Sequence, residues 1–124
     1  MIDTKHFRTS EQLKPLLSAL CQLYELDRKV QKRSEFESLS RNIEKMKAAF
    51  EELGYRIEDP LGQSYNETRM DLEASIAGAS TENLFVTEVI KPIIRQCLRE
   101  GHLEKTRVIQ NGIVVVESRE KKEP

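Results

Sequence analysis

The chain has little of several residue types, and each shortage argues against a class of protein. It contains no tryptophan, and only 6% of its 124 residues are aromatic, whereas 33% are charged. Apolar material is therefore thin for a self-sufficient monomer of this length. The 20 Lys and Arg residues are interleaved with 21 Asp and Glu residues, which argues against a nucleic-acid-binding surface. We expect an oligomeric protein that has no nucleic-acid partner.

Cysteines and long apolar runs are also scarce. Cys21 and Cys97 lie far apart, and neither belongs to a CxxC pair, so no redox or zinc motif is present. No apolar run approaches the roughly 18 residues of a membrane span. The first residues, MIDTKHFRTSEQ, lack the apolar run of a signal peptide. We therefore expect a soluble, reduced, cytoplasmic protein without a membrane partner.

The clearest pattern present is a narrow apolar stripe in FESLSRNIEKMKAAFEEL, residues 36–53. Its apolar residues recur at alternating spacings of three and four, which predicts a helix with a single apolar seam. A seam this narrow is typical of a helix paired across a dimer, and a core helix of an ordinary domain is the alternative. The stripe consists of Phe36, Leu39, Ile43, Met46, Phe50 and Leu53.

A wider apolar stripe at residues 13–30 predicts an earlier helix. Pro15 must either fall in the first turn of this helix or kink it, because proline fits poorly in a helix interior. The two stripes are out of phase, and Ser34 with Glu37 matches a capping box. We predict a turn at residues 31–34, with one long helix that shifts its apolar face as the alternative.

The pattern changes to β after Gly54, the residue expected to end the second helix. Residues 55–57 predict a short strand, and residues 84–94 predict extended chain that Pro92 restricts to an edge or a bend. Residues 64–80 leave helix and strand both open. Asn111-Gly112 lies between two β-branched runs, which predicts a hairpin turn at this pair.

This order of elements predicts an α+β fold, with helices first and a small β-rich module after them. The predicted organisation is a loose arm at residues 1–12, a helical region at 13–54, a β-rich domain at 55–118 and a tail at 119–124.

Candidates for catalysis are few. His6 lies in the predicted arm, and His102, between Gly101 and Leu103, is more typical of a surface loop. The sequence has no GxxxxGK[ST], GxGxxG or HExxH motif, and nothing in it indicates a metal or cofactor site. We therefore expect a binding or interaction protein rather than an enzyme, with its specificity on the β-rich part.

One segment carries a resemblance to a known family. REGHLEKTRVIQNGIVVVES, residues 99–118, resembles without gaps the closing signature of the GrpE family of nucleotide exchange factors, approximately QKGYxLNGRxIRPAxVVVAK. Gly101, Arg107 and Ile109 fall in matching places, as does the valine run. KPLLSAL near the start is similar to the family's LPVLDNL, and FEELGYRI is similar to its helix-to-β junction.

The resemblance implies a homodimer in which two short helices from each chain form a four-helix bundle that carries the β-rich domain outward. It implies that this domain docks on the ATPase part of a DnaK-type chaperone and holds the nucleotide cleft open without a cofactor. Arg107 is then the main chaperone contact, with Gly101, His102 and Lys105 as weaker candidates. The implied dimer interface comprises Leu16, Leu20, Leu23, Phe36, Leu39, Ile43, Met46 and Phe50.

An alternative reading keeps the same fold and removes the exchange activity. In that case the protein is a dimeric adaptor or structural interaction protein.

Overall fold

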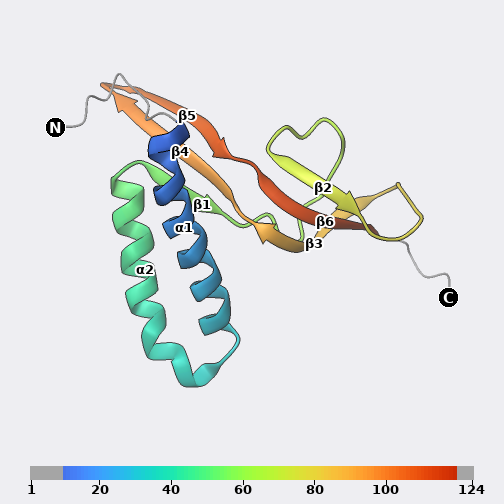
Figure 1. The fold of residues 1–124 in the computed structure, drawn as a ribbon, viewed down its shortest axis with the longest axis horizontal. Coiled ribbons are helices and arrows are strands. Elements are labelled where there is room, and N and C mark those ends of the chain that lie inside the picture. Colours follow the sequence, from blue (N-terminus) through green and yellow to red (C-terminus); the bar gives the residue numbers. More distant parts are fainter. Residues whose placement is uncertain (1–9, 120–124) are drawn as a thin grey trace.

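The computed structural model describes residues 10–119, and two helices precede six strands (Figure 1). The α+β class is therefore confirmed. Residues 1–9 and 120–124, which include most of the predicted arm and tail, lie outside the described residues. The elements are α1 (Ser10–Gln31), the 3-10 turn η1 (Ser34–Phe36), α2 (Glu37–Glu52), β1 (Tyr55–Glu58), β2 (Leu72–Ile76), β3 (Leu84–Lys91), β4 (Ile93–Glu100), β5 (Leu103–Gln110) and β6 (Gly112–Ser118).

The break between the helices is confirmed, but its expected chemistry is not. α1 begins three residues before the predicted helical region, so Pro15 lies inside it. The capping box predicted at Ser34 and Glu37 is wrong, because neither η1 nor α2 begins with a side-chain cap. The Glu37 N–H instead donates to the carbonyl oxygen of Ser34, as expected for a 3-10 turn. The backbone therefore satisfies the donor that the capping box would have used.

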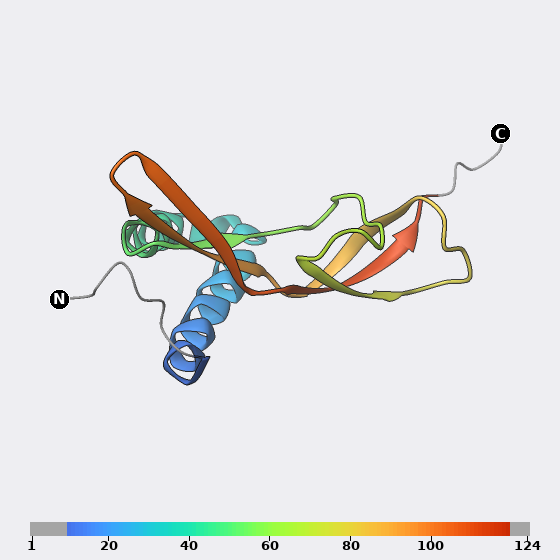
Figure 2. The same ribbon diagram turned by 90° about the horizontal axis from the view of Figure 1, so that it is seen from above.

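The six strands form two three-stranded sheets that share two long chain segments. The first sheet has the order β1-β4-β5, and the second has the order β2-β6-β3. β3 continues into β4 through Pro92, and β5 continues into β6 through Asn111, so both segments pass through both sheets. Figure 2 shows that the second sheet extends away from the helices. The molecule is elongated as a result. In Figure 1 the turn between β4 and β5 lies above the two helices, at the opposite end of the molecule from the second sheet.

The chain reverses at Gly101-His102, between β4 and β5. Gly101 has a φ of 59°, which suits a tight hairpin loop. The hairpin predicted at Asn111-Gly112 is wrong, because the chain passes there directly from one sheet to the other. Gly112 is needed for packing instead: a Cβ at this position would lie 2.8 Å from Cδ2 of Leu72.

The β-strand predictions otherwise hold. The strand expected at residues 55–57 is β1, and the segment from 84 to 94 forms β3 and the start of β4, with Pro92 at the bend between them. The ambiguous segment at 64–80 contains a strand, β2, which lies parallel to β6. A parallel neighbour so far along the chain leaves no local hydrogen-bonding signal, so alternation alone could not decide between helix and strand.

α1 attaches to both sheets. Leu20 is fully buried with Tyr55 and Ile94 of the first sheet. Tyr24, one turn later, packs into the core of the second sheet, and its hydroxyl donates a 3.0 Å hydrogen bond to Asp59. The pKa of Tyr24 is raised mainly by its burial and, to a smaller extent, by this hydrogen bond. Arg28 donates a 3.0 Å hydrogen bond to the carbonyl of Val89. One helix thus fixes the two sheets relative to each other.

Gly54 forms the joint between α2 and β1, as predicted. Its φ is 96°, and its N–H donates to the carbonyl of Glu51 at the end of the helix. Its own carbonyl accepts a 2.7 Å hydrogen bond from the N–H of Cys97 on β4. The first sheet is therefore attached to the end of α2 with no intervening loop. Within residues 10–119, neither helix combines the length and the apolar character needed to cross a membrane.

Candidate functional site

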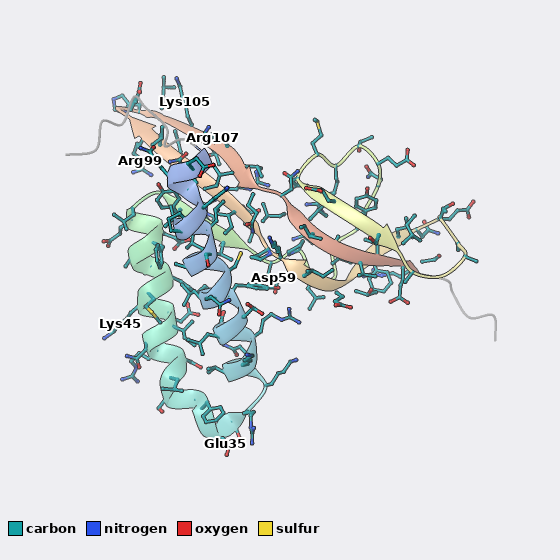
Figure 3. The ribbon with its side chains drawn as sticks, in the orientation of Figure 1. Glu35, Lys45, Asp59, Arg99, Lys105 and Arg107 are labelled. Carbon is teal, nitrogen blue, oxygen red and sulfur yellow. The ribbon has the colours of Figure 1, made fainter. Side chains whose placement is uncertain are left out.

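The β4–β5 hairpin carries all four residues proposed to contact a chaperone. Gly101 and His102 form its turn, and Lys105 and Arg107 lie two residues apart on β5, hence on one face. Figure 3 labels Lys105 and Arg107 at this end of the molecule, beside Arg99 of β4. The structure therefore gathers these residues on one hairpin but spreads them along its length.

Arg107 differs from the other three because a buried side chain holds it. His102 and Lys105 are exposed, whereas Arg107 is half-buried. Its Nε donates a 3.0 Å hydrogen bond to Oε1 of Gln96, which is only 5% exposed. Gln96 Nε2 in turn donates to the hydroxyl of Tyr55, at 3.5 Å. These three residues stand opposite one another across β1, β4 and β5.

Sequence reasoning missed Gln96. The available signal was a polar residue at the centre of the series Ile94, Gln96 and Leu98, which alternates along β4 toward one face. A glutamine flanked in this way must either reach solvent or find a buried partner. The partner could not be identified without the pairing of β4 with β5.

A separate ionic cluster lies on the other face of β4. Arg69 Nε and Nη2 each donate a 3.0 Å hydrogen bond to the carboxylate of Asp71. Arg95 contacts the same carboxylate at 3.1 Å and Glu58 at 2.6 Å. The hydrogen bond from Arg69 is the main cause that lowers the pKa of Asp71. This cluster ties the segment before β2 to the first sheet, so we assign it a role in stability rather than in binding.

Asp71→Asn is expected to lower the free energy of unfolding at pH 7 by about 1–2 kcal/mol, since two arginines lose an ionised acceptor. Because folding lowers the pKa of Asp71, its stabilising effect is complete above the unfolded pKa of about 4 and is lost as the pH falls through the folded pKa. Urea unfolding between pH 7 and pH 2 should show the two proteins converging in acid. Glu67→Gln, in the same exposed loop, is the control. A stability gap that persists at the lowest pH would contradict this role.

The helix pair presents a second candidate surface, an apolar groove of about 420 Å³ between α1 and α2. Along it, Leu26 is 44% exposed and Met46 is 41% exposed, and Leu39 on the same stripe of α2 is 46% exposed. The lining residues are Ala19, Gln22, Leu23, Glu25, Leu26, Lys29, Met46 and Phe50.

The residues expected at a dimer interface fall into two groups. Leu20, Leu23 and Ile43 are buried within one chain, so they form its core. Leu16 and Phe50 are half-buried, and three residues of the stripe remain open, namely Phe36, Leu39 and Met46. The open surface available to a second chain is therefore narrower than the whole predicted set.

No group of side chains among the described residues is arranged to hold a metal ion. Cys21 and Cys97 are both free thiols and both half-buried. Cys21 Sγ lies 3.4 Å from the amide nitrogen of Gln110, in a polar contact between α1 and β5. The features that remain for function are the hairpin with its held arginine and the apolar face of the helices.

Comparison with family models, with curated proteins and with solved structures finds no significant match to this chain.

Proposed function

We propose that the protein is a GrpE-like co-chaperone, a nucleotide exchange factor for the ATPase domain of a DnaK-type chaperone. The observation that carries the proposal is the placement of Arg107, the residue that matches the family's arginine. It lies on a protruding hairpin, half-buried, with its Nε bonded to a buried glutamine. A guanidinium held in this way is suited to a carboxylate on a partner surface.

The proposed activity needs no covalent chemistry. A protein that binds the open form of a nucleotide cleft better than the closed form shifts the population toward open, so ADP leaves faster. The extent of the shift is set by the difference between the two affinities. We accordingly assign the protein no catalytic residue, metal or cofactor, and we place its work in the cytoplasm.

The second part of the proposal is a homodimer in which α1 and α2 pair with the same helices of a second chain to form a four-helix bundle. The support comes from the open face of the helix pair, where Leu26, Leu39 and Met46 are each more than 40% exposed. Its spacing is that of a seam that a partner helix covers. In this arrangement the two hairpins project away from the bundle.

The exposed helical face also favours a second candidate function. An exposed apolar face of this kind supports a dimer but does not require nucleotide exchange. A dimeric adaptor with the same fold would have the same exposed face. The hairpin is what separates the two candidates, because only the exchange factor uses Arg107 to act on the chaperone's cleft.

The test is the release of a fluorescent ADP analogue from the ATPase domain of a DnaK-type chaperone, followed by stopped-flow. We expect the wild-type protein to accelerate release with a rate that saturates as its concentration rises. Arg107→Ala should reduce the acceleration about tenfold or more, the worth of a charge-assisted hydrogen bond.

The matched control is Arg99→Ala, which removes an arginine from the same hairpin. Arg99 is directly opposite Glu104 and points to the other face, so its loss should leave release unchanged. A wild-type protein that does not accelerate release would refute the exchange function. Equal losses in the two variants would show that Arg107 is not the contact.

A further inference from the structure

We propose that Gln96 is the positioning residue for Arg107: it holds the guanidinium in one orientation before any partner arrives. This inference rests on the proposed function for its consequence, but its structural half can be measured on the protein alone. Gln96 does not reach the partner, since it is 5% exposed and lies one strand inward from Arg107.

The burial of Gln96 is the first argument. Among residues 11–119, Gln96 is the only buried side chain that is neither aliphatic nor aromatic. A buried amide costs free energy unless its polar atoms are hydrogen-bonded, and a leucine or methionine would fill the position more cheaply. Both polar ends of this amide are used: Oε1 accepts from Arg107, and Nε2 donates to Tyr55.

The second argument is the order of the three residues across the sheet. Tyr55, Gln96 and Arg107 form a row across all three strands of the first sheet, from a buried end to a half-exposed end. The buried Tyr55 anchors the amide, and the amide orients Nε of the arginine. Because the guanidinium is planar, fixing Nε fixes the plane in which the terminal nitrogens lie.

The expected consequence is a lower entropic cost of binding. A free arginine side chain loses much rotamer freedom when it is immobilised against a partner, and a side chain that is already ordered loses less. Gln96 would therefore strengthen a carboxylate contact that it never touches. Removing it should weaken binding only as long as Arg107 is present.

The first experiment measures order at the arginine itself, by ¹⁵N relaxation and hydrogen exchange of the Arg107 Nε–H group. Gln96→Met keeps a similar volume and removes the acceptor, so we expect Nε–H to become mobile and to exchange about tenfold faster. Gln96→Glu keeps an acceptor and should keep the group ordered. Thr106→Val, on the other face of β5, is the control and should change neither quantity.

The second experiment is a double-mutant cycle in the ADP-release assay. We expect Gln96→Met to reduce the acceleration about threefold to tenfold in the wild-type background and to cause no further loss in the Arg107→Ala background. A purely structural role would lower activity in both backgrounds.

The outcomes separate the two proposals. Equal mobility of Nε–H in the wild type and in Gln96→Met would overturn the inference, as would equal loosening in Gln96→Glu or additive losses in the cycle. If the wild-type protein fails to accelerate ADP release from the chaperone, the proposed function is refuted, and the relaxation data still decide whether Gln96 orients Arg107.

Discussion

Gly54→Ala is expected to lower the free energy of unfolding by about 3 kcal/mol, measured by urea denaturation at a fixed protein concentration. Two costs add at this position. The φ of 96° is one that a side chain rarely adopts, and a Cβ would lie 2.6 Å from the carbonyl oxygen of Cys97. Because the clash is with backbone, either the sheet or the helix must move. The joint between α2 and the first sheet should then loosen.

Gly78→Ala provides the matched control. Its φ of 92° is nearly the same, but an added Cβ would meet nothing within 4 Å. Gly78→Ala should therefore lower the free energy of unfolding by about 1 kcal/mol, the cost of the unfavourable φ angle alone. The difference in stability between the two variants measures the close approach of Gly54 to β4. If both variants lose the same stability, the contact at Gly54 is not tight, and its role as a rigid joint is refuted.

Met46→Lys is expected to convert the proposed dimer into a monomer, with a dissociation constant raised about 100-fold or more. In one chain Met46 is 41% exposed, so a lysine there is tolerated by the fold. In the proposed bundle the same position is covered, and its charge would be buried without a partner. Sedimentation velocity or light scattering over a range of micromolar concentrations measures the change.

The control for this prediction adds the same charge to the same helix. Ala48 is exposed and lies two residues along α2, on the side away from the stripe, so Ala48→Lys should leave the dimer intact. Circular dichroism should show both variants folded. A wild-type protein that is monomeric at these concentrations would refute the bundle, and equal weakening in both variants would move the interface elsewhere.

The local features of the fold were predictable where a single residue or a short pattern determines them. The end of α2 just before Gly54 follows from the conformational freedom of glycine, and the turn after Gln31 follows from two stripes that are out of phase. The bend at Pro92 follows from its missing donor. Each of these depends on neighbours in sequence, which is the information that a pattern carries.

The errors arose where distant contacts decide the structure. Asn111-Gly112 has the composition of a hairpin turn, yet at Gly112 a Cβ would crowd the side chain of Leu72, forty residues earlier. The reversal falls at Gly101 instead, and there β4 and β5 pair with each other from Ile94 and Gln110 to Glu100 and Leu103. Composition could not distinguish the two glycines.

The candidate site was predictable only in its outer part. A resemblance of sequence indicated Arg107, because it compares one position at a time. The contact with Gln96 depends on the pairing of β4 with β5. Its burial depends on the helices, because Tyr55 and Ile94 on the same face of the sheet pack against α1 and α2. Likewise, the exposure of Met46 and the burial of Ile43, which share one stripe, depend on how the two helices pack.

The proposed mechanism is a difference in affinity, so the most direct test is to measure that difference. Isothermal titration calorimetry with the ATPase domain of a DnaK-type chaperone, once nucleotide-free and once saturated with ADP, gives both values. Linkage requires that a protein that weakens ADP binding is itself bound more weakly in the presence of ADP, by the same factor. We predict binding that is about tenfold or more tighter to the nucleotide-free domain. Equal affinities in the two states would contradict the exchange mechanism and leave the protein as an adaptor.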